Sequence, residues 1–356
     1  YRYRPDGQVE EVIKPNGVKL TYSYNQLGLL EEFKASDGSF HYTFEHDSLQ
    51  QVVAVHDRCR QSVQRRQYNA NKELIEEQQN HDVRVAYHYD SEGRQTGLTL
   101  PDNSQIAYHY QDSLLVAVDR LSAQHTVLYS HGYQYDENKL LKAHLPLKEI
   151  DKITLQHDNN QNTVGISSPW WSQQVETGAG DSEGRILAMY IQDSIGNHSS
   201  HFAYTKEGQL AEEDGHKYVY DSLYNLIGDG QQEWKMNSFN QLTQADECEY
   251  AYDLNGNMIE KRSKHGTIFY SYDALDRLIR LEKPKKFALT YAYDVYNRRI
   301  EQQNWKWEGA RNEWCLKDTQ KFIYDGFKYY ASVLTLNADG SLNSVGIGSL
   351  ASGECS

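Results

Sequence analysis

Aromatic and polar positions alternate along most of the chain, and the alternation keeps restarting on one short phrase. The phrase is an aromatic pair at i and i+2, then Asp or Asn, then turn residues and Leu or Ile. The clear copies start at Tyr87, Tyr218, Tyr250, Tyr270 and Tyr291, and weaker copies start at Tyr22, Tyr108, Tyr133, Phe202 and Phe322. A period of two is that of a β-strand. Because the step between copies is often about twenty residues, the sequence predicts a modular array.

The second aromatic and the acid after it are interpreted as structural residues. An acid that recurs in every unit is a turn and capping acceptor, since one active site does not need many copies of it. The Tyr rings are expected to pack between neighbouring strands. The structural residues of the repeat are Tyr24, Tyr89, Asp90, Tyr110, Tyr135, Asp136, Tyr220, Asp221, Tyr252, Asp253, Tyr272, Asp273, Tyr293, Asp294, Tyr324 and Asp325.

Turn chemistry separates the aromatic stretches. Gly93, Gly208 and Gly256 follow the repeated acid or its equivalent, and Asp6-Gly7 and Asn16-Gly17 are strong hairpin signals. No long window carries the apolar spacing of a helix between a cap and a stop. The fold class is therefore predicted to be all-β, an antiparallel strand ribbon. A single unit buries too little apolar surface to be stable alone. Neighbouring units are therefore expected to pair edge to edge into one long sheet that coils.

The array is expected to run over residues 1–342, followed by a degenerate or truncated tail at 343–356. The phrase fades at about 139–190, where an irregular insertion is expected. Trp170 and Trp171 in this insertion suit ring stacking on a sugar, but buried Trp side chains that anchor a loop are the favoured interpretation. At about 303–320, Trp alternates with polar residues across a Gly turn, which predicts an extended hairpin.

Composition narrows the function. The net charge of −14 argues against nucleic-acid binding, and the 28 Tyr residues with a mean hydropathy of −0.79 suit a sheet with water near both faces. No apolar run is long enough for a membrane span, and no signal peptide is visible. The four cysteines, Cys59, Cys248, Cys315 and Cys355, are isolated, so neither a zinc site nor a disulfide framework is expected.

Motifs for cofactors and metals are weak. Gly346-Ile347-Gly348 matches a dinucleotide fingerprint without a following helix, so no cofactor is expected. His198 and His201 are interpreted as solvated loop histidines rather than metal ligands. Asp253 opens a stretch similar to a calcium loop, but Lys264 stands where the loop needs Glu. We therefore expect no enzyme, no cofactor and no metal.

The repeats resemble the YD-repeat, or Rhs, family, in which Tyr-Asp is followed by two residues, Gly, Arg or Asn, and Leu. The phrases that begin at Tyr252 and Tyr272 carry the resemblance, and Tyr324-Asp325-Gly326-Phe327 is similar to a phrase that comes late in such regions. The resemblance implies a β-ribbon that spirals into a hollow shell, as in bacterial polymorphic toxins, the C component of insecticidal toxin complexes and teneurins.

In the bacterial members the shell encloses a C-terminal toxin, which is released by autoproteolysis at a motif that contains Asp-Pro. This sequence has no Asp-Pro dipeptide, so no catalytic residue is carried over and no self-cleavage is expected. The resemblance implies a non-enzymatic, incomplete shell that is secreted or at the cell surface and encloses or delivers a toxin. Its partners would be the cargo polypeptide or the remainder of the shell. The alternative is a cell-surface adhesion or carbohydrate-binding protein with glycan partners.

Overall fold

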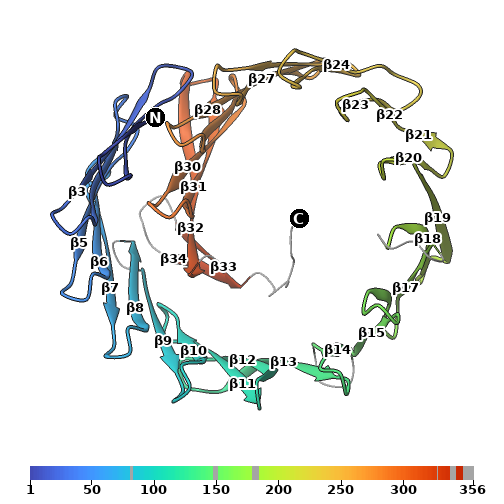
Figure 1. The fold of residues 1–356 in the computed structure, drawn as a ribbon, viewed down its shortest axis with the longest axis horizontal. Helices are drawn as coiled ribbons and strands as arrows, with labels where there is room; N and C mark the ends of the chain where they lie inside the picture. The colour runs from blue at the N-terminus through green and yellow to red at the C-terminus, as the bar shows by residue number, and fades with distance from the viewer. Residues whose placement is uncertain (81–82, 147–150, 179–183, 327, 337–341, 348–356) are drawn as a thin grey trace. The chain divides into compact units, whose positions relative to one another are not determined.

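The computed structural model describes residues 1–80, 83–146, 151–178, 184–326, 328–336 and 342–347 (Figure 1). Within these ranges every regular element is a strand and none is helical, so the all-β prediction is confirmed. The chain divides into two compact units. Unit 1 contains residues 1–85 and 237–356, and unit 2 contains residues 86–236.

The N-terminal part of unit 1 is an antiparallel meander in which each strand pairs with the next one along the chain. Its strands are β1 (Arg2–Tyr3), β2 (Val9–Ile13), β3 (Lys19–Tyr24), β4 (Leu30–Ala35), β5 (His41–His46), β6 (Val52–Asp57), β7 (Ser62–Tyr68) and β8 (Leu74–Asn80).

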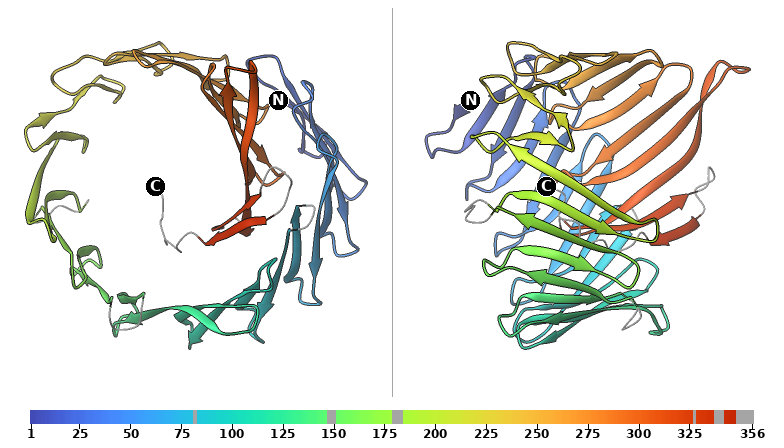
Figure 2. Two further views of the ribbon diagram at one scale, coloured as in Figure 1. Left: turned by 180° about the vertical axis from the view of Figure 1, so that it is seen from behind. Right: turned by 90° about the vertical axis from the view of Figure 1, so that its right-hand side faces the viewer.

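Unit 2 continues the same pattern of antiparallel neighbours, which the right-hand view of Figure 2 shows strand after strand. Strand β9 begins two residues before the unit boundary at Val85. The strands are β9 (Val83–Tyr89), β10 (Gln95–Thr99), β11 (Gln105–Gln111), β12 (Leu114–Leu121), β13 (Val127–Tyr135), β14 (Leu141–Leu145), β15 (Ile153–His157), β16 (Thr163–Ser167), β17 (Ser172–Thr177), β18 (Ile186–Gln192), β19 (Asn197–Tyr204), β20 (Leu210–Glu213), β21 (His216–Lys217), β22 (Val219–Tyr220), β23 (Leu226–Gly228) and β24 (Lys235–Met236).

The C-terminal part of unit 1 is a second meander with longer strands. Its strands are β25 (Leu242–Ala245), β26 (Cys248–Tyr252), β27 (Met258–Ser263), β28 (Gly266–Tyr272), β29 (Leu278–Lys283), β30 (Phe287–Tyr293), β31 (Arg299–Glu308), β32 (Glu313–Asp325), β33 (Lys328–Leu336) and β34 (Leu342–Ile347).

The two stretches in which the repeat phrase is interrupted form regular strands where the structure describes them. Across residues 139–190, β14 to β18 continue the antiparallel pairing. At 303–320, β31 and β32 form a long hairpin in which Trp307 pairs with Trp314 across the strands. Of the expected tail, residues 343–347 belong to β34. Residues 348–356, with Cys355 and the end of the Gly346-Ile347-Gly348 motif, lie outside the described residues.

In most repeats the strand register shifts at the second aromatic residue. The shift falls between Ser23 and Tyr24, between Ala251 and Tyr252, and between Ser271 and Tyr272. The extra residue of this β-bulge lies on the strand that follows the turn. The hydroxyl of the second aromatic residue donates a hydrogen bond to a backbone carbonyl in an earlier strand.

This hydroxyl contact recurs in both units and explains why the repeat uses Tyr rather than Phe. Tyr272 donates to the carbonyl of Met258 at 3.0 Å. The same bond joins Tyr24 to Val9, Tyr68 to Val52, Tyr110 to Gln95, Tyr135 to Leu115, Tyr204 to Ile186, Tyr220 to Leu210, Tyr252 to Leu242, Tyr293 to Leu278 and Tyr324 to Arg299. The bond gives the hydroxyl of each ring a partner within the sheet.

The acid after the aromatic residue organises the turn. In the repeat that begins at Asp273, Oδ1 accepts from the backbone N–H groups of Leu275 and Arg277 at 2.9 and 3.1 Å. The residue three places after the acid, Asp276, has a φ of 60°, so the turn needs a left-handed residue there. Gly256 meets the same need in the preceding repeat with a φ of 93°.

The apolar core of unit 1 lies between its two meanders. Phe40 and Tyr42 from the N-terminal strands are each 2 % exposed, and Ala274 from a C-terminal turn is equally buried against them. Leu275 and Tyr296, from two such turns, pack on the same cluster. The C-terminal strands β28 to β32 therefore lie alongside β3 to β8, as both views show (Figures 1 and 2).

Candidate functional site

A line of polar contacts joins the turns of the C-terminal repeats to the N-terminal strands within unit 1. We call this line the seam. At one end Lys14 donates to the carbonyl of Ala274 at 2.8 Å and forms an ion pair with Asp276 at 2.6 Å. Next, Arg277 donates to the hydroxyl of Tyr42 at 3.4 Å. These contacts repeat because successive turns are presented at one edge of the C-terminal sheet.

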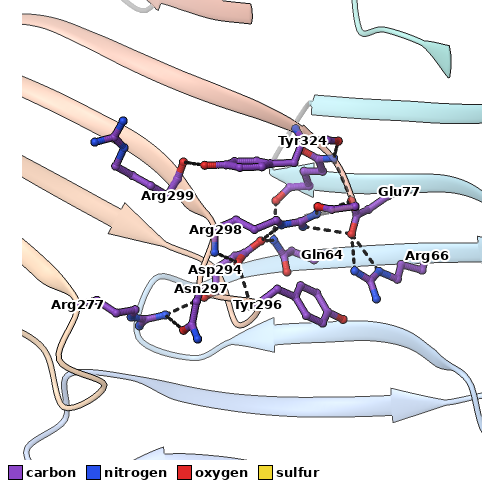
Figure 3. A network of polar contacts seen from close by, with 12 residues as sticks. Gln64, Arg66, Glu77, Arg277, Asp294, Tyr296, Asn297, Arg298, Arg299 and Tyr324 are labelled. Atoms are coloured by element: carbon purple, nitrogen blue, oxygen red, sulfur yellow. Dashed lines mark hydrogen bonds and ion pairs between the residues drawn. The ribbon is translucent and has the colours of Figure 1, made fainter. Parts of the chain in front are cut away.

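The other end of the seam is a buried charge network that we call the clasp. It comprises Arg66, Glu77 and Gln79 from β7 and β8, and Asp294, Tyr296, Arg298 and Tyr324 from the C-terminal repeats (Figure 3). The side chain of Glu77 is fully buried. It accepts from Arg298 at 2.9 and 3.1 Å and from Arg66 at 2.7 and 2.9 Å.

Arg298 connects three segments at once. Its Nε donates to Asp294 at 2.6 Å, and its Nη1 donates to the carbonyl of Gly326 at 3.0 Å as well as to Glu77. The guanidinium also lies over the rings of Tyr296 and Tyr324. Bidentate pairs of this kind fix geometry as well as charge. Arg298 therefore holds its own turn, the next repeat and β8 in one arrangement.

Gln79 adds a pair of backbone contacts to the clasp. Its side chain is buried, accepts from the backbone N–H of Tyr324 at 2.9 Å and donates to the carbonyl of the same residue. Gln64 on β7 donates to Asp294 at 3.2 Å. The amide of Gln79 thus pairs with both the backbone N–H and the carbonyl of Tyr324, as a neighbouring strand would. This pairing explains why a polar residue occupies a buried position.

Burial and paired charge act against each other in the clasp. Burial alone would raise the pKa of Glu77, but the charges of Arg298 and Arg66 and their hydrogen bonds outweigh it, so the pKa lies below its ordinary value. Burial also opposes the charge of Arg298, yet Glu77 and Asp294 hold its pKa above its usual range. Burial raises the pKa of Tyr296 to about 12. The charged forms of Glu77 and Arg298 therefore stabilise each other in the clasp.

The tips of the repeat turns differ in whether another layer covers them. Leu275 and Tyr296, each two residues after the acid, pack against the N-terminal strands. The equivalent tips Leu49 and Phe239 are 51 % and 81 % exposed, and Leu254, one residue after the acid, is 75 % exposed. An apolar residue at the turn tip is thus a general property of the repeat. In the seam, the tips Leu275 and Tyr296 pack against β3 to β8.

The structure brings only part of the repeat residues together. Asp273, Asp294 and Tyr324 meet the N-terminal strands through their turns, directly or through the Arg four residues after the acid. The carboxylates of Asp90, Asp136, Asp221 and Asp253 accept hydrogen bonds from the backbone of their own turns. Tyr89 pairs with Gln95 across a strand turn. Asp325 pairs with Lys328 at the β32–β33 turn.

Sequence reasoning missed Arg66, Glu77, Gln79 and Arg298. Glu77 and Gln79 alternate on β8, which is the spacing of one buried face, and two polar residues there signal a polar partner. Arg298 stands four residues after a repeat acid, as Arg94 and Arg277 do, and all three bind that acid. The spacing was visible in the sequence, but the partner on β8 was not.

The Trp pair departs from its favoured interpretation. The chain turns at Ser168, whose hydroxyl accepts from the backbone N–H groups of Trp170 and Trp171. Trp170 is 63 % exposed, so the expectation of a buried anchor was wrong for this residue. A side chain at the tip of a tight turn has no neighbouring strand to cover it. Trp171 is half-buried.

The residues considered for metal or redox chemistry lie apart. His198 and His201 contact different carboxylates, Asp193 at 3.7 Å and Asp214 at 3.6 Å. Cys59, Cys248 and Cys315 are unpaired thiols. Over the described ranges no group of three or more His, Cys, Asp or Glu side chains is arranged to hold a metal ion. The same ranges contain no helix long and apolar enough to cross a membrane.

Comparison with known proteins adds a family and a fold. The family model described as Teneurin YD-shell matches residues 1–167 and 178–308. The Double-stranded DNA deaminase toxin A of Burkholderia cenocepacia (strain H111) is 25 % identical over 241 residues, which are 65 % of this chain and 15 % of that protein. The chain thus spans a small part of this relative.

Two solved structures share the fold. A mutant Tc holotoxin pore of Photorhabdus luminescens matches with a TM-score of 0.56 and 14 % identity over 95 % of this chain and 22 % of that chain. The TcdB2-TccC3 protein without its hypervariable C-terminal region matches with a TM-score of 0.51 and 14 % identity over 93 % of this chain and 22 % of that chain.

Proposed function

Because the chain belongs to the Teneurin YD-shell family, we propose that it is a non-catalytic part of a β-shell that encloses a toxin polypeptide and delivers it. Its partners are the cargo polypeptide and the remainder of the shell, and its place of action is outside the producing cell or at its surface. The similar proteins carry toxin names, which supports this class of role.

The clasp is the observation that carries the proposal. A wall around a cargo needs neighbouring layers of the ribbon held in one register. The pair of Glu77 and Arg298 supplies this, because both side chains are at least 97 % buried and each has a second ionic partner. Such a pair is weak evidence for stability, but it specifies one geometry strongly when every charge is satisfied. We assign the seam to holding the shell in register.

The absence of catalysis is part of the proposal and rests on how the charged groups are used. The buried acids Glu77 and Asp294 are bound by guanidinium groups, Asp294 also by the amide of Gln64, and the pKa of Glu77 lies below its ordinary value. A general acid or base instead needs a pKa near the working pH.

Protection of a fused polypeptide tests the proposal. Residues 1–356 are produced with an unfolded polypeptide after Ser356 that contains one site for a site-specific protease. Enclosure predicts cleavage at least tenfold slower than in the free polypeptide, and Glu77→Gln restores fast cleavage because it breaks the clasp. Glu45→Gln, at an exposed position, is the matched control and retains protection. Equal cleavage rates in the fusion and the free polypeptide would refute enclosure.

Glycan binding at the cell surface is the second candidate, and the exposed ring of Trp170 favours it. An exposed aromatic ring can stack on a sugar while its edge stays in water. A glycan array with the unmodified chain and with Trp170→Ala separates the two functions. Binding that disappears in the variant supports adhesion, whereas an array without any bound glycan removes this candidate.

A further inference from the structure

Two histidines from neighbouring strands of unit 2 meet on one face of the sheet. Tyr129, His131 and Tyr133 alternate along β13, so their side chains share a face. His144 on β14 lies directly across from Tyr133 in the strand register. The Nε2 of His131 is 3.1 Å from the Nδ1 of His144. Neither residue belongs to the seam or to the repeat phrase.

The spacing of these two nitrogens is that of neighbouring metal ligands. Bonds from a transition metal to imidazole of about 2.0–2.1 Å at a tetrahedral angle place two ligand nitrogens about 3.3 Å apart. A small rotation of either ring therefore accommodates an ion between them. Within the part of the chain that the structure describes, His131 and His144 bind each other rather than a carboxylate.

The surroundings orient the rings and leave one side accessible. The hydroxyl of Tyr129 lies 3.2 Å from the Nδ1 of His131, which fixes that ring by its far nitrogen. The ring of Tyr133 packs on both imidazoles, with centroids 4.8 and 5.4 Å away. Both histidines are half-buried rather than enclosed. A far-side hydrogen bond of this kind is the usual support of a metal-binding histidine.

The neighbouring strands place few charges near the pair. Across β12, Val118 stands opposite His131 and Arg120 stands opposite Tyr129. Across β15, Ile153 stands opposite His144. The charge of Asp151 acts on Tyr129. Burial lowers the pKa of His131 and of His144.

We propose that His131 Nε2 and His144 Nδ1 form a binding site for a divalent transition metal of the imidazole-preferring class, such as Zn²⁺, Ni²⁺ or Cu²⁺. Water fills the remaining coordination positions, since within the described residues no third His, Cys, Asp or Glu completes the set. The site is open, and it stands independently of the proposed shell function.

Binding needs no net loss of a proton. In the free protein one of the two facing nitrogens carries the hydrogen of their shared hydrogen bond. When the metal takes its place, that hydrogen moves to the far nitrogen of the same ring, which is the Nδ1 facing Tyr129 for His131 or the Nε2 for His144. Each imidazole thus remains neutral, and the hydroxyl of Tyr129 can accept from His131 Nδ1–H.

Calorimetric titration with Ni²⁺ tests the site. The thiols are first blocked with N-ethylmaleimide, because Cys59 is an exposed free thiol and thiolates compete as metal ligands. We expect one ion per chain at pH 7.5, with at least tenfold weaker binding in His131→Gln and in His144→Gln. The double variant His198→Gln/His201→Gln is the matched control and keeps the affinity, because these two side chains lie on β19, which pairs with β18 and β20, and contact different acids, Asp193 and Asp214.

Folding is monitored separately by circular dichroism and by the imidazole resonances of the remaining histidines. A second readout is the broadening by Ni²⁺ of the His131 and His144 NMR resonances. It is measured on the wild-type protein and so does not require that the variants fold. Overturning results are wild-type binding no tighter than that of the His131→Gln variant, or broadening confined to other histidines.

Discussion

Arg298 and Glu77 lie 221 residues apart in the sequence and form a bidentate ion pair at 2.9 and 3.1 Å, with 3 % and 0 % of their side chains exposed. The pair joins the turn before β31 to the middle of β8. Removal of one partner leaves the other charge buried with only its second ionic partner, Asp294 for Arg298 or Arg66 for Glu77, which is more costly than removal of both.

Glu77→Gln is therefore expected to lower the free energy of unfolding of unit 1 by about 3–5 kcal/mol. Chemical unfolding measures the loss, and hydrogen exchange locates it in β7 and β8. Glu45→Gln should change the same free energy by less than about 1 kcal/mol, because its partner His56 binds it at the surface. Replacing both partners, in Glu77→Leu/Arg298→Met, should recover part of the loss; a double variant as unstable as the single one would contradict this explanation.

The Tyr hydroxyl of the repeat is expected to contribute separately from the ring. Tyr272→Phe removes only the bond to the carbonyl of Met258 and should cost about 0.5–1.5 kcal/mol. Tyr272→Ala also removes the packed ring and should cost about 2–4 kcal/mol. Thermal unfolding of the two variants compares them, with the exposed Tyr224→Phe as a control that should not change. Equal losses in both Tyr272 variants would mean that the ring packs on nothing.

A strained turn offers a stabilising change. Tyr224 has a φ of 65°, in the left-handed region where a bulky side chain is unfavourable by about 1–2 kcal/mol. After allowing for the greater freedom of Gly in the unfolded chain, Tyr224→Gly should raise stability by about 0.5–1 kcal/mol. The reverse type of substitution is Gly208→Ala. Because φ is 87° at Gly208, this substitution should lower the stability of the protein. Melting temperatures that move in the same direction for both variants would refute the argument.

The facing histidines predict acid sensitivity in unit 2. Burial, and for His131 also the charge of His144, lowers both pKa values below the ordinary 6.5. A lowered folded-state pKa for a base means that the unfolded chain takes up protons first. The stabilisation is thus complete above about pH 6.5 and is lost as the pH falls through the lower folded-state values.

Hydrogen exchange in β13 and β14, followed from pH 7.5 to 5, measures this effect after correction for the intrinsic exchange rate. His131→Gln/His144→Gln should flatten the dependence, while the variant in His198 and His201 should not. An unchanged slope in the first variant would show that other groups titrate.

Local features of the fold followed from the sequence, and the seam did not. The spacing of Tyr270 and Tyr272 and the turn after Asp273 report on neighbouring residues, so their period identifies strands and turns directly. The register shift at Tyr272 is marked by no particular residue type and therefore leaves no simple pattern in the sequence. The contact of Arg298 with Glu77 depends on which strand of one meander faces which turn of the other, and one sequence carries no record of that.

In the turn after Asp294, the hydrogen bonds that form the turn do not depend on the side chain at its tip. One oxygen of the acid, Oδ1, accepts from the backbone N–H groups of Tyr296 and Arg298, while Oδ2 accepts from the side chain of Arg298. Any residue with an N–H can therefore stand at the tip, and Pro alone is barred at the position of Tyr296, since it would remove a donor. Mutations can therefore change the residues at the turn tips one at a time while the strands and turns keep their geometry. The contact surface formed by the tips can diversify faster than the fold.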